Sequence, residues 1–233
     1  MQSLRSAPAA VSVAFVVVIH AVVGSGCAAS VDGEVNGAAL PAILSAAWST
    51  NEGEDAITLL LATHLDVCGT TVRRTQAYAD DIAALLEESR APTTDEIDGV
   101  MEAADQRTAP GDDYWTLSFS FFVDDLDALE GAELDVASHF LLGSVCHQQG
   151  RPDYDDDGLD ANSECSFTRE PEIRVGAFAE DGNLEFEGDT ALIDGDGDDN
   201  GQLALRGAAA PCPALTDARA AFADALQAVE DAR

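Results

Sequence analysis

The stretch YWTLSFSFFV, residues 114–123, indicates the fold class of this chain. Large apolar side chains alternate with smaller polar ones at a period of two, which is the repeat of an extended strand. This alternation is typical of a strand that buries one face in a core. We therefore expect residues 114–123 to form a core strand of a β-rich domain. The expected buried face consists of Trp115, Leu117, Phe119 and Phe121.

Other strand-like segments lie on both sides of this one. They are short, apolar and separated by turn-forming residues, and Asp181-Gly182 predicts a hairpin turn between two of them. The expected strands are 31–34, 42–50, 56–64, 134–145, 172–179, 184–188, 190–194 and 202–207.

Three segments predict helices instead. Residues 71–89 carry a helical apolar stripe, and a second short helix follows with Thr93 or Thr94 as its N-cap and Glu96 in its first turn. Residues 214–233 form an Ala-rich terminal helix. We expect a mainly β domain, an antiparallel sandwich or barrel, with a helical insertion near residues 70–105 and a C-terminal helix. An α+β fold is the alternative.

The composition excludes some functions. The chain has 233 residues, with 44 Asp and Glu against 11 basic residues, all Arg, and a formal net charge of −33. Such a charge argues against nucleic acid as a partner, because both surfaces would be negative. Acid excess without Lys also fits a salt-adapted surface that does no more than hydrate well. No nucleophile elbow, phosphate loop, dinucleotide fingerprint or zinc-protease motif occurs, so a binding or structural module is favoured over an enzyme.

The first residues predict export. Residues 9–23 are uncharged and mostly apolar, which is too short for a membrane span and typical of a signal-peptide core. Small residues precede Cys27, a pattern that resembles the lipobox of bacterial lipoproteins, although Gly24 replaces the usual aliphatic residue. We expect 1–26 to be a signal peptide, 27–36 a lipid anchor and tether, and 37–233 one exported domain. Removing 1–26 removes Arg5 and no acid, so the exported part carries −34.

The whole arrangement resembles uncharacterised lipoproteins of bacterial envelopes. The resemblance implies lipidation of Cys27 and attachment to the outer membrane or cell surface. Ordinary signal-peptide cleavage would instead give a soluble periplasmic or secreted protein. Only the lipidated form would have the membrane as a partner, through its lipid, and neither route implies an activity.

The cysteine count agrees with export. Five cysteines are present, and a lipid on Cys27 would leave four for two disulfides, with three possible pairings. We favour Cys146–Cys165, which closes a local loop, and Cys68–Cys212, which joins the early part of the chain to the late part.

Residues 153–164, DYDDDGLDANSE, match the calcium-loop pattern D-x-[DN]-x-[DN]-G-x₅-E. Calcium prefers six to eight oxygen ligands, and a glycine permits the sharp turn that lets carboxylates converge. The loop is similar to the DxDxDG loops of thrombospondin type 3 repeats and dockerins, and the resemblance implies calcium binding. The expected ligands are Asp153, Asp155, Asp157, the Leu159 carbonyl and Glu164.

A second acidic stretch, residues 194–201, is a weaker candidate. Its ligands would be Asp196, Asp198 and Asn200, but no closing Glu follows, so a hairpin turn is the favoured interpretation. Taken together, the sequence predicts an exported, lipid-anchored surface protein, a binding or structural module with one calcium loop. The alternative is an exported hydrolase that uses carboxylates or calcium.

Overall fold

The structure is a computed structural model. It describes residues 29–51, 56–88, 91–122, 134–135, 140–154, 160–178 and 182–233. The predicted signal peptide and Cys27 lie outside these residues. The described part contains ten strands, two consecutive helices inserted mid-chain and one C-terminal helix, so the predicted mainly β fold is confirmed.

The strands form one mixed sheet. Their pairings run from β3 through β4, β5, β7, β8, β9 and β10 and back to β3, which closes a ring of seven strands. The strands are β1 (Ala29–Val35), β2 (Ala38–Ala39), β3 (Ser45–Asn51), β4 (Ala56–Ala62), β5 (Asp113–Phe122), β6 (Leu134–Asp135), β7 (Phe140–Gln149), β8 (Ser163–Phe178), β9 (Leu184–Ile193) and β10 (Asp199–Pro211).

One pair departs from the expected antiparallel arrangement. β10 and β3 are parallel, through Ala210 opposite Ala47 and Pro211 opposite Trp48. The cause is geometric, because neighbouring strands cannot alternate in direction all the way round a ring with an odd number of members. The parallel pair is short and lies where β10 leaves the sheet.

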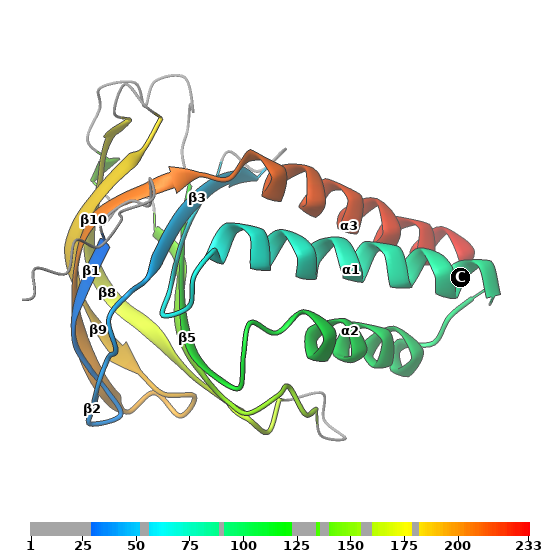
Figure 1. The fold of residues 1–233 in the computed structure, drawn as a ribbon, viewed down its shortest axis with the longest axis horizontal. Coiled ribbons are helices and arrows are strands. Elements are labelled where there is room, and N and C mark those ends of the chain that lie inside the picture. The colour runs from blue at the N-terminus through cyan, green and yellow to red at the C-terminus, as the bar shows by residue number, and fades with distance from the viewer. Residues whose placement is uncertain are drawn as a thin grey trace, which may run out of the picture.

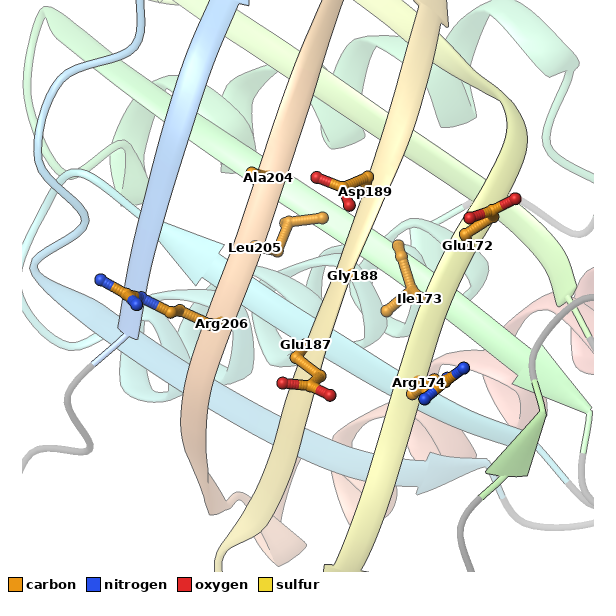
Figure 2. Close-up of a pocket in the computed structure, with 9 residues that line it drawn as sticks. All are labelled: Glu172, Ile173, Arg174, Glu187, Gly188, Asp189, Ala204, Leu205 and Arg206. Carbon is orange, nitrogen blue, oxygen red and sulfur yellow. The ribbon is translucent and has the colours of Figure 1, made fainter.

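The ring is flattened into two walls with the main core between them. β1, β10, β9 and β8 form one wall, and Figure 2 shows them crossing in front of the strands of the other wall. All four apolar side chains predicted for the face of β5 are buried in this core. Other core residues include Leu59, Leu61, Ile173, Phe186, Leu203 and Leu205.

The strand predicted at residues 31–34 is present and extends over residues 29–35, which lie within the range assigned to the tether. These residues form β1, which pairs with β10 from Ala29 opposite Gly207 to Val35 opposite Gly201. The physical reason is apolar burial, because Val31 and Val35 are both packed in the main core. The folded domain therefore begins two residues after Cys27 rather than at residue 37.

Gly188 allows β9 to approach the backbone of β8 closely. Its φ is +154°, a conformation that favours glycine. A Cβ atom there would lie 2.1 Å from the carbonyl oxygen of Glu172 on the adjacent strand. The close approach of the two backbones is therefore possible only without a side chain at this position.

Three helices project from the outer face of the other wall and pack mainly against one another (Figure 1). They are α1 (Val67–Glu88), α2 (Thr94–Thr108) and α3 (Pro213–Ala232). In Figure 1, α1 and α3 leave the sheet side by side in the same direction, and α2 runs back toward it. None of the helices in the described ranges is both long enough and apolar enough to cross a membrane.

The helix starts follow from local hydrogen bonds. Thr93 caps α2 in a capping box with Glu96, which confirms one of the two predicted caps. The first inserted helix begins at Val67, four residues before the predicted 71. Its start is fixed by Asp66, whose carboxylate accepts from the Gly69 amide at 2.9 Å, and by Ser45, whose hydroxyl accepts from the Val67 amide at 3.1 Å.

Two disulfides hold the fold together, and both favoured pairings are confirmed. Cys68–Cys212 joins the first turn of α1 to the N-cap of α3, beside an apolar cluster that includes Leu60 and Leu215. Cys146–Cys165 links directly opposed positions of β7 and β8. Paired cysteines indicate an oxidising compartment outside the cytoplasm.

Candidate functional site

A cleft of about 390 Å³ lies between the helices and the outer face of β5 and β7. α1 and the C-terminal end of α2 form one side, and residues from 152 to 163 contribute at the edge. Its size falls within the range of small-molecule sites. The polar and charged side chains that line it include Thr70, Arg74, Asp105, Tyr114, Gln148, Tyr154, Asp160 and Arg219.

The cleft exists because the outer face of this wall changes character across its width. On β4, Leu60 and Ala62 are buried beneath the N-terminal ends of α1 and α3. On β5 and β7 the same face carries small hydroxyl residues, with Ser118 opposite Ser144. Such side chains bury little apolar surface, so these strands offer little to hold a helix against them. The floor of the cleft is therefore polar and lined with hydroxyls.

A buried carboxylate, Asp105, organises one side of the cleft. Asp105 lies on α2 and is only 7% exposed. Its Oδ1 accepts a hydrogen bond from the Tyr78 hydroxyl of α1, and its Oδ2 accepts one from the Tyr154 hydroxyl. The Arg74 Nε atom lies 3.9 Å from Oδ1. Two phenols and a guanidinium thus compensate the cost of burying this charge.

All three tyrosines of the chain belong to this region. Burial is the largest cause that raises the pKa of Tyr78, Tyr114 and Tyr154 above the ordinary tyrosine value. The negative charge of Asp105 also acts in this direction on each of them, because it disfavours a second negative charge nearby. The phenols are therefore protonated at neutral pH, as the donation of hydrogen bonds from Tyr78 and Tyr154 to Asp105 requires.

Two of the eleven arginines line the cleft. The Arg219 Nη1 of α3 donates to the Ser49 hydroxyl at 3.0 Å and to the Thr58 hydroxyl at 3.3 Å, both of which are buried. Arg74 of α1 stands closer to the opening, with 40% of its side chain exposed. Against them stand two carboxylates, Asp105 and Asp160. The cleft is therefore far less negative than the chain as a whole.

His64 also lines the cleft and is held in a defined orientation. Its Nδ1 lies 2.9 Å from the Leu65 carbonyl oxygen, and its ring packs edge-on against Tyr114. Burial lowers the pKa of His64 below the ordinary value. At neutral pH it is thus uncharged.

Gln148 is the one buried polar side chain of the described residues that has an unpartnered atom. It is 7% exposed, lies opposite Tyr114 in the β5–β7 register and lines the cleft. Its Nε2 amide group has no hydrogen-bond partner within the described residues. Buried amides are normally paired, so this donor points to a partner from outside the chain.

No family model, curated protein or solved structure matches this chain.

The predicted calcium loop lies beside the cleft, and the structure describes its two ends. Asp155, Asp157 and Leu159 are outside the described residues. The Ala161 amide donates to the Asp153 carbonyl at 2.8 Å, and Tyr154 forms an isolated antiparallel bridge with Asp160. The Asp160 carboxylate accepts from the amides of Asp153 and Asn162, each at 3.0 Å. Asp160, which the calcium pattern leaves unspecified, therefore joins the two ends of the loop, and these joined ends are called its neck.

Glu164, the predicted closing ligand, lies in β8 opposite His147. It is exposed and lines a separate hollow of about 230 Å³ together with Trp115, His147 and Asn200. Its neighbour Ser163 lines the cleft instead, because successive residues of a strand point to opposite faces. The structure thus brings Glu164 close to the second acidic stretch.

That second stretch forms a turn between β9 and β10. The Asp194 carboxylate accepts from the amides of Asp196 and Asp198, each at 3.0 Å. The Asn200 side chain donates to the Ser166 hydroxyl at 2.6 Å and is therefore engaged within the sheet. Over the described ranges, no three His, Cys, Asp or Glu side chains converge as a metal site. The calcium prediction stays a prediction.

A larger hollow lies on the opposite side of the molecule. This dish, of about 560 Å³, lies on the outer face of β8, β9 and β10. Figure 2 shows the charged side chains that surround Gly188 there. Arg174, Glu187 and Arg206 occupy directly opposed positions on the three strands. Opposite charges in such positions stabilise an exposed sheet surface. No buried unpartnered group is present in this dish among the described residues, so the cleft is the better site candidate.

Local sequence patterns do not predict this cleft. Its components come from four distant segments, and only the folded arrangement joins them. One signal was present, because Asp105 follows Ile97 and Met101 at intervals of four residues and so places a carboxylate on the buried stripe of α2. A charge at such a position is rarely buried without partners.

Proposed function

We propose that this chain is an exported, lipid-anchored binding module of a bacterial envelope, and that its ligand site is the cleft between the helices and β5 and β7. The observation that carries the proposal is a polar cleft of ligand size in a framework that is already fixed. One disulfide pins α1 to α3, and Asp105 joins α1 and α2 to Tyr154 at the cleft edge. A preformed site loses less entropy when a ligand binds.

The anchor follows from the N-terminal sequence. A lipid on Cys27 would leave only Ala28 between the modified residue and the first residue of β1. β1 lies in the wall that is remote from the helices (Figure 1). The domain would then sit directly on the outer leaflet, with the helices and the cleft facing away from it.

Binding is favoured over hydrolysis for a specific reason. A carboxylate-dependent hydrolase needs an acid or base that is free to exchange a proton with its substrate. Both oxygens of Asp105 accept from phenols, and Asp160 accepts from two backbone amides. These carboxylates hold the cleft in shape instead.

Native mass spectrometry of the full protein, purified from its own membrane, tests the proposal. We expect a small-molecule adduct on the wild type and its loss in Ser144→Tyr, which places a ring in the cleft. Leu142→Tyr is the matched control, because Leu142 lies two residues away on the same strand and is 57% exposed outside the cleft. An adduct retained by Ser144→Tyr, or none on the wild type, would contradict the proposal.

We also propose that loop 153–164 binds one calcium ion. The ligand spacing supports this, and so does the neck, in which Asp160 brings Asp153 and Asn162 together. Calcium titration by calorimetry should give heat with the wild type and with Asp196→Ala, and none with Asp155→Ala. Heat that persists in Asp155→Ala, or no heat with the wild type, would remove the idea.

A further inference from the structure

We infer that the cleft binds its ligand through a small oxyanion, a carboxylate or phosphate group, which accepts hydrogen bonds from Gln148 and Arg74. This inference rests on the proposed function of the cleft as a ligand site. It adds the chemical class of the ligand, which the shape of the cleft alone does not provide.

The hydrogen-bond donors and acceptors of the cleft favour a ligand that accepts hydrogen bonds. Its carboxylates already accept hydrogen bonds within the chain, Asp105 from two phenols and Asp160, through Oδ1, from two amides. The unpartnered group, the Gln148 Nε2, is a donor. The ligand that completes this set of hydrogen bonds is an acceptor.

Arg74 supplies a positive charge on the wall of the cleft. Within the described residues its interaction with Asp105 is through Nε at 3.9 Å, and 40% of the side chain is exposed. Its positive charge acts on the phenol of Tyr114, which is the strand partner of Gln148. Arg74, Tyr114 and Gln148 all line the cleft. A guanidinium and an amide donor in one cleft are well suited to an oxyanion, because charge-assisted hydrogen bonds are strong.

The net charge of the chain limits the size of the anionic ligand. The chain carries a net charge of −33, which repels large polyanions. At physiological salt, charges are largely screened beyond about 8 Å. A small anion inside the cleft thus feels Arg74 at short range and little of the remote acids. The ligand is therefore a small molecule with one oxyanion group rather than a polymer.

Acetate and inorganic phosphate are suitable probes of this inference. The full protein, with its lipid and disulfides, is titrated with each anion against chloride at matched ionic strength, with a chelator present and the melting temperature as readout. We expect acetate or phosphate to raise the melting temperature more than chloride does. Whichever anion acts identifies a carboxylate or a phosphate as the group that is recognised.

Variants then assign the effect to the cleft. Arg74→Gln and Gln148→Leu should each weaken the anion response by about tenfold or more, since each removes a hydrogen bond to a charged group. The controls are the neighbouring residues, Arg73→Gln and Gln149→Leu, which do not line the cleft. Far-ultraviolet circular dichroism checks that every variant is folded. If Gln148→Leu does not fold, Gln148→Asn, whose shorter side chain draws the donor amide back from the ligand, replaces it and should also weaken the response.

The outcomes separate this inference from the proposed function. Equal effects of Arg74→Gln and Arg73→Gln would overturn the inference. So would a neutral adduct that is lost in Ser144→Tyr while neither anion acts, although the cleft would then still be the ligand site. No adduct and no anion response would contradict both.

Discussion

The two disulfides should differ in how much they stabilise the domain. Cys68–Cys212 spans a sequence separation of 144 residues, and Cys146–Cys165 spans 19. In the chain-entropy model these separations correspond to about 5 and about 3 kcal/mol of the free energy of unfolding. Cys146 and Cys165 also face each other across the paired strands β7 and β8, so the sheet already holds them together.

The measurement is urea unfolding of three oxidised proteins. We expect Cys68→Ala with Cys212→Ala to lose about 2 kcal/mol more of the unfolding free energy than Cys146→Ala with Cys165→Ala. Alanine is chosen because Cys212 is buried in an apolar cluster, where a serine hydroxyl would add a separate penalty. Equal losses, or a larger loss for the Cys146–Cys165 pair, would refute the reasoning that the long closure is the stronger constraint.

Three further predictions concern the buried phenols and His64. Tyr154→Phe removes a donor from Asp105 and should lower the free energy of unfolding by about 1–3 kcal/mol in urea titrations, and an unchanged midpoint would contradict this. The pKa of every tyrosine is raised in the folded state, so the tyrosines of the unfolded chain ionise first and the free energy of unfolding falls as the pH rises above about 10. In an alkaline titration, phenolate absorbance should therefore appear together with the loss of circular dichroism; phenolate absorbance that appears before it would contradict this. The pKa of His64 is lowered in the folded state, so its contribution to the free energy of unfolding is present above about pH 6.5 and is lost as the pH falls. Between about pH 7 and pH 5, the melting temperature of His64→Gln should therefore fall less than that of the wild type. Melting temperatures that fall in parallel would contradict this.

The local patterns of the sequence predicted most of the fold. The period-two alternation of residues 114–123 placed four side chains in the main core, because alternation depends only on neighbouring residues. The capping box of Thr93 and the two disulfide pairings were also predicted, the latter from the spacing of four cysteines. These features need no knowledge of how distant strands meet.

Features that depend on the closed ring were not predictable in this way. The parallel pairing of β10 with β3 follows from the odd number of strands, which no segment reveals alone. The strand predicted at residues 31–34 extends to 29–35, because Val31 and Val35 pack in the core that the distant strands build.

The candidate site was the least predictable part. The acidic loop was chosen from its ligand spacing, yet its described residues also supply Tyr154 and Asp160 to a cleft of different chemistry. Arg74, Asp105 and Gln148 occupy two helices and a strand, and nothing in their local sequence links them. Their relation is a property of the tertiary structure.

Nuclear magnetic resonance of the Gln148 side-chain amide tests the central claim most directly. The account predicts that its two Nε2 proton signals shift when acetate or phosphate is added to the full protein, and that their exchange with water slows. The signals of Gln149, which does not line the cleft, should stay unchanged. Gln148 signals that are indifferent to both anions, or that move no more than those of Gln149, would contradict the assignment of the cleft as an oxyanion-binding site.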